Sequence, residues 1–99
     1  MADTIRISYS GLIRNALGVH EEDVPVADGM VVRDLLKELW QRHGNAFARS
    51  VLNRNGGLRA NAQMLLGGRD IREIDGLDTK LGGHADAYIS VIVHATEGG

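Results

Sequence analysis

The sequence predicts an α+β domain, residues 1–99, in which a single sheet is covered by one main helix. Three segments indicate this class: Thr4–Ser10 alternates between apolar and polar residues, residues 28–44 carry an apolar stripe with helical spacing, and Asp86–His94 is apolar at odd and even positions alike. These patterns are typical of a half-buried strand, an amphipathic helix and a central strand flanked on both edges. Two strands before the helix and three after it indicate the α+β class.

The first strand is expected to have one apolar and one polar face. Its apolar residues are Ile5, Ile7 and Tyr9, and its polar residues are Arg6, Ser8 and Ser10. The segment GLIRNALG that follows predicts a helical turn, with Gly18 as its C-terminal stop because glycine reaches the left-handed conformation without a Cβ clash. A second strand is expected from Val19 to Val26. Pro25 favours an edge position for it, since proline cannot donate to a neighbouring strand.

The main helix is expected within residues 28–44. Its apolar stripe consists of residues four apart, with Val31, Leu35 and Leu39 in one row and Val32, Leu36 and Trp40 in the next. Asp28 is expected to cap the N-terminus of this helix, and Gly44 is expected to end it. Glu38 and Arg42 have the spacing of a stabilising ion pair on its polar side.

The elements after the main helix are shorter. Asn45–Leu52 predicts a short helical turn, and a third strand is expected at Asn61–Leu66. Gly67 and Gly68 are expected to form a hairpin turn that leads to a short return strand near Ile71.

The last strand is expected to present two different faces. The more apolar set, which should meet the main helix, consists of Ala87, Ile89, Val91 and Val93 together with Ile5 and Ile7 of the first strand. The open face should carry Tyr88 and Ile92, framed by polar residues that include Arg6 and His94. An apolar pair with a polar frame is a candidate docking surface for a partner protein, and a partly covered strand face is the alternative interpretation.

The composition excludes several classes of function. The chain has 11 basic and 13 acidic residues, a net charge of -2 and no basic block, so we expect no nucleic-acid binding. It contains no cysteine, which excludes disulfides and thiolate metal sites and favours the cytoplasm. The first ten residues, MADTIRISYS, lack the pattern of a signal peptide, and no stretch is long enough to span a membrane. We therefore expect a cytoplasmic protein without a membrane partner.

The histidines do not predict a metal site. His20 with Glu22, or His84 with Asp86, could touch a metal as neighbours on one strand face. The favoured interpretation of both pairs is a solvated polar strand end, and we expect no bound metal.

The remaining polar and aromatic residues do not indicate an active site either. The acidic run at residues 21–23 is interpreted as an exposed edge rather than a catalytic pair. Trp40 and Phe47 are expected in the core rather than on a cofactor-binding surface. We therefore expect a protein that is not itself an enzyme.

The chain ends in ATEGG, and the Gly98–Gly99 pair has no turn to make. The three other Gly-Gly pairs lie between apolar stretches where the chain must reverse its direction, which is a common use of glycine. Either Gly98 and Gly99 are a frayed end, or the free carboxylate of Gly99 is the functional group of this protein.

Five segments, taken in order, resemble the MoaD/ThiS family of ubiquitin-like sulfur carriers. They are GLIRNALG after the first strand, GMVVRDLLKEL in the helix, LLGGRDI at the hairpin, GLDTKL before the last strand and the terminal GG. The resemblance covers nearly the whole chain. It implies a β-grasp fold, with the first and last strands parallel at the centre of one mixed sheet and a flexible tail at about residues 95–99.

The resemblance also implies a chemistry for the terminus. An E1-like adenylyltransferase would use ATP to convert the carboxylate of Gly99 into an acyl-adenylate, and a sulfur donor would then convert it into a thiocarboxylate. Gly98 would let the tail thread into a narrow channel, because it has no Cβ. The ATP belongs to the activating enzyme, so no cofactor is expected to be bound permanently. The final partner would be a sulfur-accepting biosynthetic enzyme.

Other functions remain open at this point. The chain could be the small subunit of molybdopterin synthase, a ubiquitin-like protein modifier conjugated through Gly99, or a β-grasp interaction module with a frayed tail. Relatives often carry an apolar, proline-containing segment before the two glycines, whereas this chain has the polar residues His94, Thr96 and Glu97 and no proline there. The receiving pathway is therefore left open among the molybdenum cofactor, a thiazole, cysteine and a thiolated tRNA base.

Overall fold

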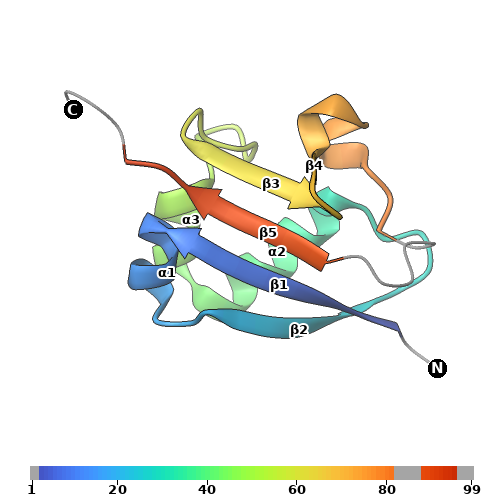
Figure 1. Cartoon of the computed structure of the whole chain (residues 1–99), viewed down its shortest axis with the longest axis horizontal. Helices are drawn as coiled ribbons and strands as arrows, with labels where there is room; N and C mark the ends of the chain where they lie inside the picture. The colour runs from blue at the N-terminus through green and yellow to red at the C-terminus, as the bar shows by residue number, and fades with distance from the viewer. Residues whose placement is uncertain (1–2, 82–87, 96–99) are drawn as a thin grey trace.

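The computed structural model describes residues 3–81 and 88–95 and shows one five-stranded sheet with its helices on one face (Figure 1). Its elements are β1 (Asp3–Gly11), α1 (Leu12–Leu17), β2 (Glu21–Val26), α2 (Val32–His43), α3 (Asn45–Val51), β3 (Ala62–Leu66), β4 (Arg69–Asp70), the 3-10 turns η1 (Ile71–Glu73) and η2 (Gly76–Asp78), and β5 (Tyr88–Val93). The predicted α+β class is confirmed. The expected tail at about residues 95–99 lies outside the described residues, apart from Ala95.

The strand order is β2-β1-β5-β3-β4, so β1 and β5 occupy the centre of the sheet. These two strands run parallel, with Arg6 opposite Tyr88 and Gly11 opposite Val93. All other neighbouring strands pair antiparallel. The prediction of a central last strand is confirmed, because β5 pairs with β1 on one edge and β3 on the other. Its predicted first residues, Asp86 and Ala87, lie outside the described residues.

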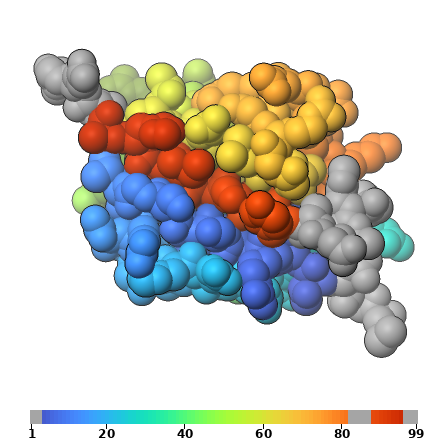
Figure 2. Space-filling model, viewed as in Figure 1, coloured from blue at the N-terminus to red at the C-terminus, as the bar shows by residue number. Residues whose placement is uncertain are grey.

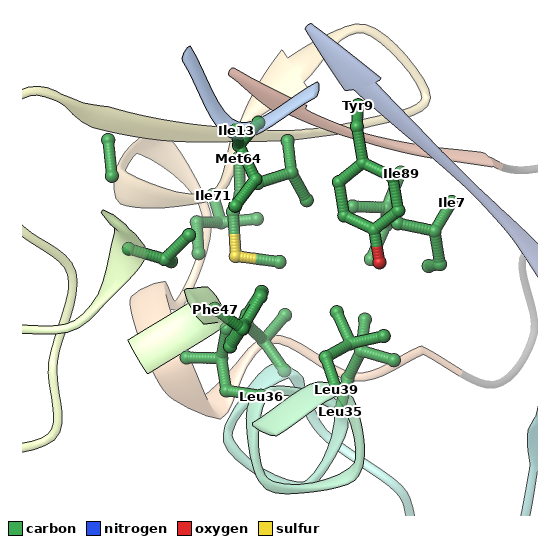
Figure 3. Close-up of a cluster of buried hydrophobic side chains, with 14 of the residues drawn as sticks. Ile7, Tyr9, Ile13, Leu35, Leu36, Leu39, Phe47, Met64, Ile71 and Ile89 are labelled. Carbon is green, nitrogen blue, oxygen red and sulfur yellow. The ribbon is translucent and has the colours of Figure 1, made fainter. Parts of the chain in front are cut away.

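The core lies between the sheet and the helices. Figure 3 shows Ile7, Tyr9 and Ile89 from the central strands above Leu35 and Leu39 of α2. All five are at most 2% exposed. The apolar face of β1 and the apolar stripe of α2 therefore meet in the core as predicted. Burying each such aliphatic side chain contributes about 1.5–3 kcal/mol relative to leaving it in water.

Two glycines with positive φ bound α1. Gly18, with φ of 69°, ends the helix as predicted, and its N–H donates to the carbonyl of Arg14. Gly11, with φ of 76°, precedes the helix, and a Cβ at this position would overlap the carbonyl oxygen of Val93. Gly11 is therefore needed both for its backbone conformation and for the close approach of two strands, whereas Gly18 is needed for its backbone conformation alone.

The predicted N-cap of the main helix is wrong. Asp28 and Gly29 form a turn, and the helix begins at Val32. The carboxylate of Asp34 accepts a hydrogen bond from the backbone N–H of Val31 at 3.0 Å. An acid inside the first turn thus accepts from a free backbone N–H at the start of the helix, in place of the cap predicted at Asp28. The predicted stop at Gly44 is confirmed.

The placement of Trp40 in the core is also wrong, because its side chain is 46% exposed. Each four-residue step along an α-helix advances the side chain by about 40° around the axis. Val32 and Leu36 face the core, and Trp40 is turned out of it. Phe47, on α3, is fully buried as predicted. Within the described residues, no helix is both long enough and apolar enough to cross a membrane.

The remaining boundaries differ from the predictions by one or two residues. The edge strand β2 begins at Glu21 rather than Val19. The return strand is only β4, and Ile71 is the first residue of η1, where it is fully buried. The predicted ion pair between Glu38 and Arg42 is present, with an N–O distance of 3.0 Å.

Candidate functional site

The face of the sheet opposite the helices is the candidate partner surface, which we call the open face. Figure 2 shows it with β5 running between β1 and β3. Its residues on the three strands are Arg6, Ser8, Ser10, Gln63, Leu65, Tyr88, Ser90 and Ile92. Tyr88 is 49% exposed, whereas Ile92 is half-buried. The predicted division of β5 into a buried and an open side is therefore confirmed.

Arg6 lies beside Tyr88 on the open face and is held by two acids of β2. Its guanidinium is 3.1 Å from the carboxylate of Asp23 and 3.6 Å from that of Glu21. The hydrogen bond to Asp23 and the charges of both acids raise the pKa of Arg6 above its ordinary value. All three side chains are more than half exposed, so these pairs orient Arg6 while contributing little to stability.

His94 follows β5 and completes the set of four predicted partner residues. Its ring nitrogen Nε2 lies 3.2 Å from the side-chain oxygen of Gln63, which is opposite Ile92 in the sheet. The structure thus brings Arg6, Tyr88, Ile92 and His94 onto one face. Their use by a partner stays a prediction.

Asn61 holds the backbone of His94 from both sides. The N–H of His94 donates to the carbonyl of Asn61 at 2.9 Å, and the side-chain amide of Asn61 donates to the carbonyl of His94 at 2.9 Å. We call this pair of hydrogen bonds the Asn61 clamp. It fixes the chain one residue beyond β5. The predicted functional residues Gly98 and Gly99 lie outside the described residues.

A second polar cluster, which sequence reasoning missed, joins β1 and β2 to the end of α2. The carboxylate of Glu22 accepts hydrogen bonds from the hydroxyl of Tyr9 at 2.7 Å and from Arg42 at 3.0 Å, and it also pairs with the ring of His43. Interpreting the whole acidic run as an exposed edge was therefore wrong for Glu22, whose side chain is only 15% exposed. Glu22 and the buried Val24 are two residues apart on one strand and therefore share a face, which could have shown that Glu22 faces inward.

The environment of this cluster shifts two pKa values in opposite directions. Burial alone would raise the pKa of Glu22, but the hydrogen bonds from Tyr9, His43 and Arg42 together lower it below its ordinary value. Burial, followed by the hydrogen bond to Glu22, raises the pKa of Tyr9 far above its ordinary value. Glu22 is thus held as a carboxylate and Tyr9 as a neutral donor, an arrangement that positions β2 against α2.

The two histidine pairs considered as metal ligands are separated or lie outside the described residues. His20 pairs with Arg14, with 3.1 Å between their nitrogens, while Glu22 turns toward His43. His84 and Asp86 belong to the part that is not described. Within residues 3–81 and 88–95, no three histidine or acidic side chains are grouped as metal ligands.

Replacing Glu22 with glutamine is expected to destabilise the protein by about 1–3 kcal/mol at pH 7, because three partners lose a charged acceptor in a half-buried site. The folded pKa of Glu22 lies below that of the unfolded chain. Its stabilisation is therefore complete above an unfolded pKa of about 4.3 and is lost as the pH falls through the folded value.

Urea unfolding at a series of pH values measures this effect. The difference between wild type and Glu22→Gln should shrink as the pH falls below about 4. The matched control is Glu21→Gln on the neighbouring residue, whose carboxylate is 56% exposed and whose removal should cost little. Equal losses in the two variants would contradict the assigned role of Glu22.

No protein-family model matches the sequence, and no curated protein matches it. Several solved structures do. A putative molybdopterin converting factor, subunit 1, from Pyrococcus furiosus is 24% identical, with a TM-score of 0.72 over 94% of this chain and 99% of that chain. SAMP1 from Haloferax volcanii is 18% identical, with a TM-score of 0.78 over 97% of this chain and 99% of that one. A chain of the Amycolatopsis orientalis BexX/CysO complex is 21% identical, with a TM-score of 0.66 over 95% and 99%.

These matches span almost the full length of both partners in each comparison, so they concern the whole arrangement of elements. At 18 to 24% identity, they establish the fold. The described part of this chain has the central parallel strands and the antiparallel flanking strands of the predicted architecture. This chain therefore has the β-grasp fold that the MoaD/ThiS resemblance implies.

Proposed function

We propose that this protein is a sulfur carrier whose working group is the carboxylate of Gly99. An E1-like adenylyltransferase would activate that carboxylate with ATP, and a sulfur donor would convert it into a thiocarboxylate. The thiocarboxylate would then supply sulfur to a biosynthetic enzyme. The protein itself contributes a presented terminus and a docking surface rather than an active site.

The observation that carries this proposal is the position of the Asn61 clamp. It holds His94 at the end of a central strand, and the sequence places Gly99 five residues later. Five extended residues reach at most about 18 Å, so an enzyme that docks near the end of β5 has the terminus within range. Because the clamp fixes the backbone of His94, the tail begins from a defined position, which supports presentation of Gly99 to an enzyme.

The chemistry explains why activation is needed and why glycine suits the site. A carboxylate resists nucleophilic attack because of its negative charge and its resonance, and adenylation provides a good leaving group. Sulfide from the donor then attacks the acyl carbon, forms the C–S bond of the thiocarboxylate and displaces AMP. Gly98 and Gly99 offer the narrowest backbone that a channel can admit, since neither has a Cβ.

Intact mass measurement tests this proposal directly. The protein is incubated with its activating enzyme, ATP and a sulfur donor, and a parallel reaction omits ATP. The complete reaction should add the mass difference between sulfur and oxygen, located at Gly99 by fragmentation, whereas the ATP-free reaction should leave the mass unchanged. An unchanged mass in the complete reaction, with an enzyme that loads its own known carrier, would exclude the carrier function.

The similarity to SAMP1, a small archaeal modifier protein, supports a ubiquitin-like modifier as the second candidate function. In that case Gly99 would form isopeptide bonds with lysines of other proteins. A protease digest of cells that contain the protein would then release lysines carrying a C-terminal remnant of this chain. A small subunit of molybdopterin synthase would instead copurify with a large catalytic subunit and support pterin product formation.

The Ile92→Asp substitution is expected to weaken binding of the activating enzyme at least about tenfold, because it places a charge on the central strand of the open face, next to the end from which the tail leaves. Ile92 is half-buried between Ser10 and Gln63, on the side of the sheet away from the helices. The fold should persist, since the core lies on the opposite side.

Affinity is measured by titration with the activating enzyme, and folding by circular dichroism. The control is Ala46→Asp, an exposed position on α3 in the helical layer, which should bind as wild type does. If folded Ile92→Asp retains full affinity, the partner surface is not the open face.

A further inference from the structure

Trp40 lies on the helical side of the molecule and is the only tryptophan of the chain. Two hollows of about 310 and 330 Å³ lie beside it, and Trp40 and Lys37 line both of them. The first also reaches Leu52 and Gly56, which follow α3. We call the two hollows together the Trp40 groove. Because α2 covers the other face of the sheet, this groove is separate from the open face.

The Trp40 groove combines a large aromatic surface with apolar packing beneath it. Leu36 and Leu52, which line it, are only 3% and 7% exposed, while Trp40 is 46% exposed. Tryptophan is enriched among the residues that dominate binding energy at protein interfaces. An aliphatic side chain placed in the groove would bury the indole face and remove apolar surface from water.

The charge of the groove is opposite to that of the whole protein. The described residues that line it include two cations, Arg33 and Lys37, and no acid, although the chain carries a net charge of -2. Lys37 forms no ion pair with any residue that the structure describes. Arg33 pairs with Asp78 at 3.1 Å, but both side chains are more than half exposed, so this pair is easily exchanged for another acid.

We propose that the Trp40 groove binds a short peptide segment of a partner protein in which acidic residues flank a leucine or a similar aliphatic side chain. The aliphatic group packs against Trp40, and the carboxylates pair with Lys37 and Arg33. This site does not depend on the terminal carboxylate. One partner can therefore occupy the groove while another partner binds the open face.

A peptide titration tests the proposal with Trp40 as its own probe. The full chain is titrated with the capped peptide Asp-Glu-Leu-Asp-Leu-Glu and, separately, with Asn-Gln-Leu-Asn-Leu-Gln, which has nearly the same shape and no charge. Trp40 fluorescence and the NMR signal of its indole N–H should change saturably with the acidic peptide. The uncharged peptide should bind at least about tenfold more weakly, and added salt should weaken the acidic one.

The two lysines of the chain provide matched variants. Lys37→Glu, in the groove, should reduce affinity for the acidic peptide at least about tenfold. Lys80→Glu makes the same change of charge at an exposed residue that does not line the groove, and it should have little effect. Both positions are exposed, so both variants should fold, as circular dichroism can verify.

Several results would overturn the proposal. These are the absence of saturable binding at millimolar peptide, equal binding of the uncharged peptide, and equal losses in the two lysine variants. NMR shifts confined to the open face would place the peptide there instead. Changes in the indole signal that follow protein concentration without peptide would identify a second copy of this chain as the occupant.

Discussion

Appending one alanine after Gly99 is expected to abolish sulfur loading while leaving the fold intact. The extension moves the carboxylate about 3.5 Å along the chain and places a Cβ beside the carbon that must react. Misplacement of reacting atoms by far less than this can cost about a hundredfold in rate, so the loss should be at least that large. The core is untouched, because the described core residues end at Val93.

A second variant separates the position of the carboxylate from the width of the tail. Gly98→Val leaves the carboxylate where it is and adds a branched side chain that restricts the backbone. It should also load poorly, through obstruction rather than displacement. Both variants are assayed by intact mass after incubation with the activating enzyme, ATP and a sulfur donor, with wild type in parallel.

The alanine extension must be shown to be uncleaved, because a protease that trims it would restore the wild-type end. If the verified extended protein is loaded at the wild-type rate, the function does not reside in the carboxylate of Gly99. The frayed-end interpretation of the two glycines would then stand. If only Gly98→Val is loaded normally, the terminal carboxylate acts without a narrow channel.

Gly11→Ala is expected to destabilise the protein by about 2–6 kcal/mol. A side chain at φ of 76° and ψ of -145°, a region that is essentially restricted to glycine, carries about 1–3 kcal/mol of backbone strain. The new Cβ would also overlap the carbonyl oxygen of Val93 on the neighbouring central strand, and such overpacking costs about 1–3 kcal/mol more. For a domain with a total stability of about 5–15 kcal/mol, this is a large fraction.

Gly18→Ala is the matched control for this prediction. Gly18 lies at the other end of α1 with φ of 69°, and a Cβ there would meet nothing within 4 Å. Gly18→Ala should lose only the strain of the left-handed conformation, about 1–2 kcal/mol, because ψ at Gly18 is 18°. Urea unfolding followed by Trp40 fluorescence compares the two midpoints, with equal slopes expected. Equal midpoints would show that neither the contact with Val93 nor the more restricted backbone of Gly11 adds to the loss.

The sequence predicted the elements whose patterns reflect one dominant force. Burial on one side produced the alternation of Ile5 and Ile7, and burial on both sides produced the doubly apolar run around Ile89. The order of the elements then restricted the fold class, because two strands, a long helix and three strands have few ways to share one core. The division of β5 into a buried side and an open side with Tyr88 followed from the same alternation.

The features that sequence reasoning missed depend on contacts between distant segments. Asp34 replaced Asp28 as the acid at the start of α2, because the chain turned at residues 28–29 before the helix began. Glu22 became an acceptor for Tyr9 and His43, which are 13 and 21 residues away along the chain. Trp40 is the exception, because its exposure follows from the advance of about 40° per four-residue step, which is a local property of the helix. Local spacing gives no information about which segment lies opposite.

Parallel pairing of β1 with β5 also sets when this protein can fold during its synthesis. β1 ends at Gly11 and β5 begins at Tyr88, so a ribosome needs roughly 4–15 seconds to make the residues between them. Until then β1 has only β2 as a neighbour, and a two-stranded hairpin is marginally stable in water. A nascent chain that stops before Tyr88 would leave the inner edge of β1 unpaired, which exposes it to aggregation and proteolysis. The cell would thus tend to remove incomplete chains before any partner meets them.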